Sequence, residues 1–256
     1  MAHIGISNAA PQIRRVPLER PWIWLAAGWR DIWRAPGVSL TYGAVFAAIS
    51  MTLTVGLFAI GLEYLLPPLV AGFMLVGPML AVGLYETSRR LEAGEPVTLG
   101  AALFAVTRAP TQLAFLGVFL ALALLFWMRV ASLLFALFFG TMNFPPLGEI
   151  LPTLFFTWEG LSLLIVGSAF GAVLAAAVFA ISVVSVPLLM VRDVDAVTAM
   201  IVSIRAVRAN LVVLALWAWL VAVLTGFGLI PAYLGLIVTF PLVGHATWHA
   251  YRDLID

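Results

Sequence analysis

The placement of the arginines is the feature that most constrains how this chain folds. All thirteen basic residues are Arg, in a sequence that is 64% hydrophobic. They fall in alternate polar gaps between long apolar runs, and Arg129 alone falls inside a run. Positively charged residues stay on the cytoplasmic side of a membrane because they resist translocation. The pattern therefore predicts a multi-pass protein of a bacterial inner membrane.

The apolar runs predict an all-α fold, a polytopic membrane helical bundle. Charged residues make up 10% of the chain, whereas soluble domains carry about 25%. About 20 apolar residues cross the hydrocarbon, and a helix satisfies every backbone polar group within it. The runs lack the apolar–polar alternation of an outer-membrane barrel. The absence of Cys excludes disulfides and Cys-ligated metals.

Six transmembrane helices are expected, and the gaps between them set their orientation. The expected spans are residues 38–61, 66–87, 111–139, 161–190, 210–226 and 228–246. The gaps near 62–65, 140–160 and 227 hold no Arg, and the alternate segments all do. Both termini are therefore predicted to be cytoplasmic. The 140–160 gap is too apolar for a free loop, so we expect it to lie on the outer surface or to dip inward.

The chain divides into a tail and one membrane domain. Residues 1–20 lack the apolar core of a signal peptide and are expected to be a disordered tail. Residues 21–256 are expected to be a single integral membrane domain. A threefold internal repeat would divide it into units 21–95, 96–192 and 193–256. Ordinary membrane-helix composition is the alternative explanation of the repeat.

Each unit of the repeat would hold an interfacial helix, a span and a kinked span. A short amphipathic segment precedes each odd-numbered span, and its start signals are Pro21, Thr98 and Asp195. A proline lies inside each even-numbered span and should bend it. The recurring triplets are Arg34-Ala35-Pro36, Arg108-Ala109-Pro110 and Arg208-Ala209-Asn210, and the span prolines are Pro78, Pro187 and Pro241.

The three short amphipathic helices are expected to lie along the cytoplasmic interface and to contact lipid, including anionic lipid. Tryptophan suits that depth because its ring is apolar and its N–H needs a polar partner. The lipid-contacting residues predicted on this basis are Trp22, Trp29, Trp33, Arg34, Arg108 and Arg208.

Arg129 is the sharpest candidate for a functional side chain, because a charge inside a span is costly. It lies ~27 Å along its span at 1.5 Å per residue, near the outer interface. We expect it to reach the interface and pair with Glu149 or Glu159. A gate or anionic-substrate site, or a contact between subunits, is the alternative.

Glu86 closes the second span beside Arg89 and Arg90. Helical pairing at i,i+3 and i,i+4 is expected, and a proton path through a protonatable Glu86 is the alternative. His245 and His249 lie four apart and could offer two imidazoles to zinc or haem. Because further ligands are missing, we expect interfacial histidines that bond headgroups or carbonyls, with no metal and no cofactor.

Several segments resemble a bacterial family of predicted integral membrane proteins, domain of unknown function 2189. The segments are Gly28-Trp29-Arg30-Asp31, Leu75-Val76-Gly77-Pro78, Gly83-Leu84-Tyr85-Glu86, Ser88-Arg89-Arg90, Leu133 to Gly140, Ser185 to Leu189, Arg192 to Asp195 and Gly244 to Asp253. The resemblance covers nearly the whole chain after the tail and implies no activity. Some similar sequences carry the label cytochrome c oxidase subunit I, which the six spans and few histidines of this chain contradict. Association with a respiratory complex stays open.

The leading functional hypothesis is a non-enzymatic accessory, assembly or membrane-organising protein, with a membrane-protein partner or a second copy of itself. No nucleophile elbow, phosphate loop, dinucleotide fingerprint or acidic metal cluster is present. A transporter or channel for a small solute or ion is the rival, because kinked helices at repeat interfaces build substrate sites. A membrane-embedded enzyme ranks third. Nucleic acid is not expected as a partner.

Overall fold

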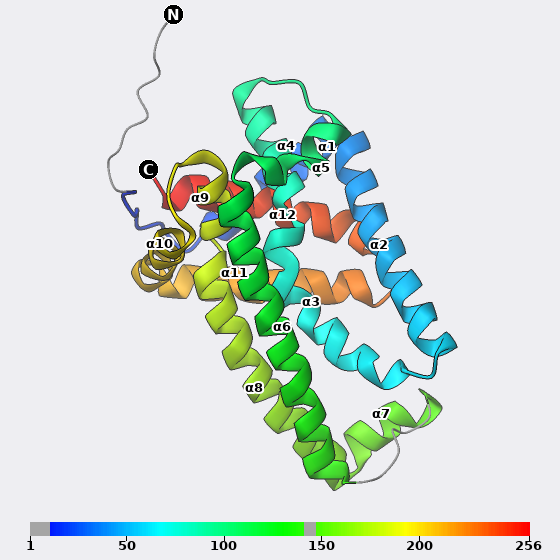
Figure 1. Ribbon diagram of the computed structural model, residues 1–256. Coiled ribbons are helices and arrows are strands. Elements are labelled where there is room, and N and C mark those ends of the chain that lie inside the picture. Colours follow the sequence, from blue (N-terminus) through cyan, green and yellow to red (C-terminus); the bar gives the residue numbers. More distant parts are fainter. Residues whose placement is uncertain (1–10, 141–146) are drawn as a thin grey trace, which may run out of the picture.

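The computed structural model describes residues 11–140 and 147–256, and within them the regular structure is helical apart from one isolated β-bridge (Figure 1). The elements are α1 (Arg20–Arg34), α2 (Pro36–Ala59), the 3-10 turn η1 (Glu63–Leu65), α3 (Leu66–Leu80), α4 (Val82–Ala93), α5 (Leu99–Leu103), the 3-10 turn η2 (Ala105–Arg108), α6 (Pro110–Phe139), α7 (Leu147–Phe156), α8 (Trp158–Ser182), α9 (Ser185–Val191), α10 (Ala196–Ala209), α11 (Leu211–Leu229) and α12 (Leu236–Leu254). The all-α prediction is confirmed.

Five helical stretches in these described ranges are long and apolar enough to cross a membrane. They are Pro36–Ala59, Glu63–Ala93, Pro110–Phe139, Trp158–Val191 and Leu211–Leu229. The sixth expected span, 228–246, does not qualify. Its helix α12 starts later and runs on through the polar residues His245 to Asp253, so it is too polar by composition.

Helices α11 and α12 run across the long helices rather than alongside them. In Figure 1, α6 and α8 lie together along the length of the molecule, while α11 and α12 form a returning pair that crosses them. The first described residues meet the C-terminal residues on the same side. The N–H of Arg14 donates to the carbonyl of Leu254 at 2.9 Å, and Ile13 forms a β-bridge with Ile255.

That pairing corrects the expected tail. Residues 11–19 are not disordered, because they bond the C-terminal strand-like residues and Asn210. The Asn210 side chain accepts from the N–H of Val16 at 2.9 Å and donates to the carbonyl of Arg14 at 2.9 Å. Residues 1–10 lie outside the described residues.

The proline-bearing helices respond differently to their prolines. The second span breaks at Ala81, three residues after Pro78, into α3 and α4. The fourth breaks ahead of Pro187, into α8 and α9. Helix α12 stays continuous through Pro241. Pro241 cannot donate to the carbonyl of Ile237, and that carbonyl packs against Gly43 of α2, where any Cβ would overlap it.

The three short helices begin where the sequence indicates. Pro21 lies in the first turn of α1, Thr98 accepts from the N–H of Ala101, and Asp195 accepts from the N–H of Thr198. The middle helix is the shortest, because α5 gives way to η2 after Leu103. The corners into α2 and α6 share one backbone conformation, with Ala35 at φ −135° and ψ 57° and Ala109 at φ −144° and ψ 65°. A following proline excludes the helical conformation at both alanines.

Candidate functional site

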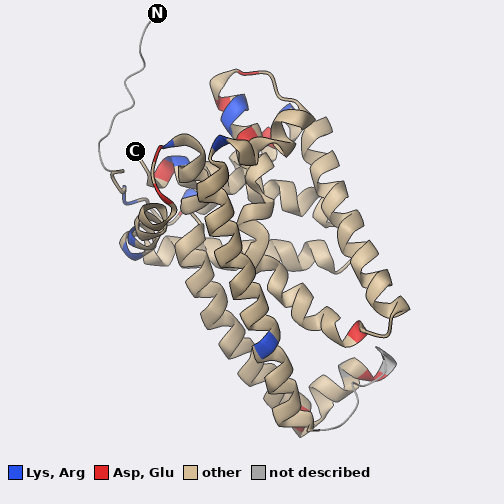
Figure 2. Ribbon diagram, in the orientation of Figure 1, with Lys and Arg blue, Asp and Glu red and all other residues tan. Residues whose placement is uncertain are grey.

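Charged side chains gather at one end of the molecule, where α1, α4, α5 and α9 lie (Figure 2). The long helices α6 and α8 extend away from this end and are almost free of charge along their length. We call this end the polar cap. It is the candidate functional site because it holds the buried polar side chains Asp31, Ser39, Glu86, Ser88 and His245.

The centre of the polar cap is a chain of hydrogen bonds that links four helices. Ser39 Oγ lies 2.9 Å from Nε2 of His245, and Ser88 Oγ lies 2.8 Å from its Nδ1. Ser88 donates to Oδ2 of Asp31 at 2.7 Å, and Nε2 of His249 bonds the same oxygen at 2.8 Å. Helices α1, α2 and α4 are therefore each bonded to a histidine of α12.

The donors and acceptors in this chain fit one tautomer of His245. Because Ser88 donates its proton to Asp31, its oxygen accepts from His245, which places the imidazole proton on Nδ1. Nε2 then accepts from the hydroxyl of Ser39. Burial by itself would raise the pKa of Asp31, but the hydrogen bonds from His249 and Ser88 outweigh it and lower that pKa. Asp31 therefore stays a carboxylate.

Close backbone approach places these side chains together. A Cβ at Gly28 of α1 would lie 2.7 Å from the backbone nitrogen of Ala246, so only glycine lets α1 meet α12 this closely. Gly244 likewise lies against Leu84 of α4. Asp31 is one turn beyond Gly28 on the same buried face of α1, which points it at His249 and Ser88.

Glu86 forms the second part of the polar cap. It is 1% exposed and accepts from Arg89 at 2.9 and 3.0 Å and from Arg90 at 2.7 Å, the pairings that its spacing predicts. Arg108, at the end of η2, adds a third contact at 2.7 Å. This carboxylate therefore ties α4 to the segment that leads into α6, and Arg108 is directed at Glu86 rather than only at headgroups.

Two further carboxylates hold the C-terminal helix. Asp253 accepts from Nε of Arg20 at 2.7 Å and from the indole N–H of Trp24 at 2.6 Å. Glu92 of α4 accepts from Trp248 at 3.1 Å and from Arg252 at 3.0 Å. Helix α12 is thus fixed to α1 along one side and to α4 along another.

The arrangement of Ser39, His245 and Asp31 has the residue types of a hydrolase but not the access. Ser39 and His245 are each 0% exposed and bond each other inside the protein. Within residues 11–140 and 147–256, no three His, Asp or Glu side chains could hold a metal ion together.

The histidines do not face the interface as expected. His245 lies inside the molecule between two serines, and His249 bonds Asp31 instead of headgroups or backbone carbonyls. The interfacial expectation assumed that the polar end of α12 faces the headgroups. The helix instead lies among α1, α2 and α4, so the imidazole face is internal.

The expected partners of Arg129 do not meet it. Arg129, Glu149 and Glu159 are all exposed, and none of them belongs to an ion pair among the described residues. The buried face of α6 includes Trp127, whose N–H donates to the carbonyl of Pro68 at 2.8 Å. Arg129 follows Trp127 by two residues, which is a rotation of about 200° around the helix axis, so Arg129 faces outward.

The aromatic residues of α1 divide between its two faces. Trp24 is 1% exposed and packs edge-on against Trp217, with ring centres 5.6 Å apart. Trp22, Trp29 and Trp33 are 56%, 45% and 58% exposed. Arg34 and Arg208 are also exposed, and no ion pair of the described residues includes either.

Residues 65–191 match the model of a family described as predicted integral membrane protein, domain of unknown function 2189. Over these residues the chain belongs to that family. It is a multi-pass integral membrane protein. No curated protein and no solved structure matches the chain. The match is narrower than the resemblance we expected: it contains Glu86 and Ser88 but neither Asp31 nor the histidines.

Asp31, Ser39 and Ser88 were missed as site residues. Their partners lie 57 to 218 positions away in the chain, so no local spacing reveals them. One signal was present. Asp31 is an acidic residue on an amphipathic helix, in register with Gly28 and Trp24 rather than with the exposed tryptophans.

Proposed function

We propose that this protein is a non-enzymatic membrane-organising or accessory protein that binds anionic lipid along α1 and presents that helix to a partner in the membrane. The observation that carries the proposal is the division of α1 into two faces. One face is buried and bonded to α12 through Trp24 and Asp31, and the other exposes Trp22, Trp29 and Trp33.

The exposed face of α1 suits the depth of the headgroups. Arg30 and Arg34 are exposed beside the three tryptophans. Indole rings favour the boundary between hydrocarbon and water, and guanidinium groups bind phosphate with two parallel hydrogen bonds. Because the other face is held by buried contacts, the helix can present this pattern without ordering on binding.

Helix α10 has a similar division. Ala199, Val202 and Ser203 are buried, whereas Val197 and Ile201 are 50% and 44% exposed near the exposed Arg208. Ser203 accepts from the N–H of Val184 at 3.2 Å, where the fourth span breaks between α8 and α9. A second lipid-facing helix is therefore anchored to the bundle at that break.

The membrane and orientation complete the proposal. We infer a bacterial inner membrane with the polar cap on the cytoplasmic side, since the Arg-bearing segments cluster there. The pairing of residues 13–14 with residues 254–255 supports an even number of crossings. Helices α11 and α12 would then act as the last, strongly tilted pair of six.

Lipid retention tests the proposal. The protein is purified from membranes in a mild detergent, and bound phosphatidylglycerol is counted by native mass spectrometry. Replacing Arg30 and Arg34 together with Gln should remove most of the retained phosphatidylglycerol. Replacing Arg252, which pairs with Glu92 at the same end, should not. Equal retention by both variants would overturn the proposal, and blue native electrophoresis with and without the α1 change then shows whether a partner complex depends on it.

Transport of a small neutral solute is the second candidate. The observation in its favour is that α3 and α12, which carry Pro78 and Pro241, both border a cavity in the spans. Midplane sites in transporters form at such interrupted helices. Solute uptake or conductance in proteoliposomes separates the two functions.

A further inference from the structure

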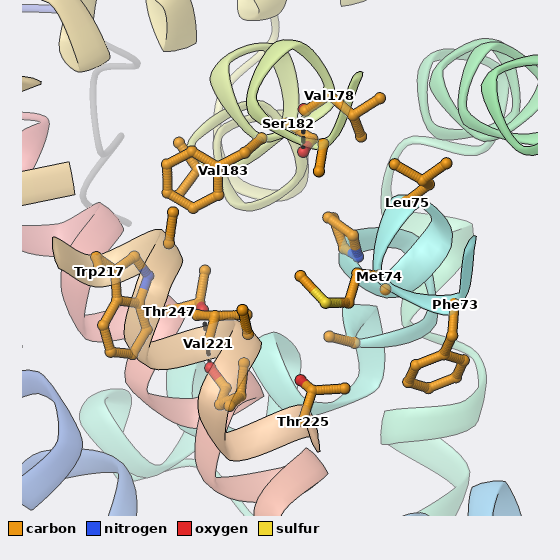
Figure 3. A pocket seen from close by; sticks show the side chains of 18 of the residues that line it. Phe73, Met74, Leu75, Val178, Ser182, Val183, Trp217, Val221, Thr225 and Thr247 are labelled. Atoms are coloured by element: carbon orange, nitrogen blue, oxygen red, sulfur yellow. Dashed lines mark hydrogen bonds between the residues drawn. The ribbon is translucent and has the colours of Figure 1, made fainter. Parts of the chain in front are cut away.

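A cavity of about 250 Å³ lies between α3, α8, α11 and α12 (Figure 3). Small residues create it: Ala175 and Ala176 on α8, and Ala218 and Ala222 on α11, where larger side chains would fill the space. Apolar side chains such as Leu75, Val178 and Val221 form most of the wall. No Asp, Glu, Lys, Arg or His of the described residues lines it.

The cavity contains polar donors without partners. The indole nitrogen of Trp217, a residue 0% exposed, has no hydrogen-bond partner in the part of the chain that the structure describes, and in Figure 3 it lies on the side of the ring toward the cavity. Neither Tyr85 nor Thr225 joins a side-chain hydrogen bond of the described residues, and both line the cavity. A buried donor left unpaired costs about 1–3 kcal/mol. A ligand with acceptor oxygens would remove that cost.

The other hydroxyls in the wall are already bonded. Ser182 donates to the carbonyl of Val178 and Thr247 to the carbonyl of Val243, each at 2.7 Å. These bonds are the dashed lines in Figure 3. The unbonded donors of the wall among the described residues are therefore those of Trp217, Tyr85 and Thr225.

The cavity is open on the side of the membrane and closed toward the polar cap. Ala172 and Ala176, on the spanning helix α8, are exposed. Tyr85, Val183 and Trp217 at the other end are buried. A ligand therefore enters from the lipid side, and its tail stays in the hydrocarbon.

We propose that this cavity binds the compact, neutral, carbonyl-bearing head of a membrane-soluble lipid of the isoprenoid quinone class. Carbonyl oxygens accept from Trp217 Nε1 and from the hydroxyls of Tyr85 and Thr225. The missing counter-charge excludes a carboxylate or phosphate head, whose burial without a partner is costly. The volume is slightly below the ~300–1,000 Å³ of ligand pockets, so it takes a head and not a whole lipid.

Binding of decylubiquinone to the detergent-purified protein tests this site. Undecylbenzene is the matched ligand, because it has a similar apolar tail on a ring without carbonyls. Decylubiquinone should raise the melting temperature and co-elute at about one per chain, and undecylbenzene should do neither. Trp217→Phe removes one donor and should weaken binding about tenfold, the equivalent of one net hydrogen bond. Trp219→Phe on the exposed face of α11 should leave binding unchanged.

A second pair of variants protects the test against misfolding. Ala222→Leu fills the cavity and should abolish binding, whereas Ala215→Leu, on the exposed face of the same helix, should not. Melting temperatures without ligand identify any variant that fails to fold. Equal binding of the two ligands, unchanged affinity in both Trp217→Phe and Ala222→Leu, or a phospholipid chain that decylubiquinone does not displace would each overturn the proposal. The retention of phosphatidylglycerol at α1 is measured separately, so either proposal can fail alone.

Discussion

In the polar cap, single buried carboxylates bond side chains from several helices or turns. Asp31 and Glu86 are both nearly inaccessible, yet each accepts several hydrogen bonds from side chains on other turns or helices. Breaking one side of a buried pair costs more than the pair gains on forming, because the partner is left desolvated. These residues therefore specify which helices meet.

Acid should weaken the protein partly through Asp31. Its folded pKa is lowered by the hydrogen bonds of His249 and Ser88 despite burial, so its contribution is fully present above the unfolded pKa of about 3.9. That contribution is lost as the pH falls toward and through the folded pKa. Asp31→Asn should show a lower melting temperature at pH 7 and a flatter fall between pH 5 and pH 3 than the wild type. If the melting temperatures of the two proteins fell in parallel between pH 5 and pH 3, Asp31 would not contribute to the pH dependence of stability.

Ser88 should be more sensitive than its small size suggests. Ser88→Ala leaves Nδ1 of His245 without a partner and removes one of the two side-chain hydrogen bonds to Asp31, and an unsatisfied buried group costs about 1–3 kcal/mol. Ser132, exposed on α6 and bonded only to its own helix, is the matched control. Chemical or thermal unfolding in detergent should show a clear loss for Ser88→Ala and almost none for Ser132→Ala. Equal losses would remove the buried chain from the account.

Glu86 should matter more than its neighbour Glu95, although both bond Arg89. Glu86→Gln leaves Arg89, Arg90 and Arg108 without their shared carboxylate, a loss of roughly 3 kcal/mol because the arginines still reach water. Glu95→Gln removes an exposed contact and should change the melting temperature little. A larger loss of melting temperature in Glu95→Gln than in Glu86→Gln would show that the exposed contact dominates.

The helix boundaries show which structural features the local sequence predicts. Starts at Pro21, Thr98 and Asp195, and breaks near Pro78 and Pro187, follow from turn and proline chemistry and are readable in advance. The course of α12 is not, because it depends on backbone approach at Gly28 and Gly43. A glycine in an apolar segment does not reveal which helix will pack against it.

The two faces of α1 give a test with the same residue type on one helix. Trp24→Ala removes a buried ring and should destabilise the protein by about 3–5 kcal/mol in detergent. Replacing Trp22, Trp29 and Trp33 together with Ala should leave the detergent melting temperature nearly unchanged, since they face outward. Transfer from detergent into anionic nanodiscs should raise the melting temperature of the wild type, and this gain should be smaller in the triple variant. A large detergent effect of the triple variant would place those rings against protein.

At the scale of the molecule, the sequence predicts an integral membrane protein, but it does not predict how the helices cross one another. The apolar length of Pro110–Phe139 indicates a span on its own, whereas the course of α12 depends on its contacts with α1, α2 and α4. The meeting of residues 13–14 with residues 254–255 likewise follows from tertiary structure alone. It nevertheless constrains the fold strongly, because it holds residues 13–14 and residues 254–255 side by side.

Cysteine labelling in intact cells tests the central claim, that the polar cap and both paired ends lie on the cytoplasmic side. The chain has no Cys, so single substitutions at Ile60, Glu95, Trp158, Asp193 and Asp256 each report one position. A membrane-impermeant maleimide should label residues 60 and 158 in intact cells and residues 95, 193 and 256 only after the membrane is opened. Labelling of residue 256 from outside, with residue 95 still protected, would contradict the account.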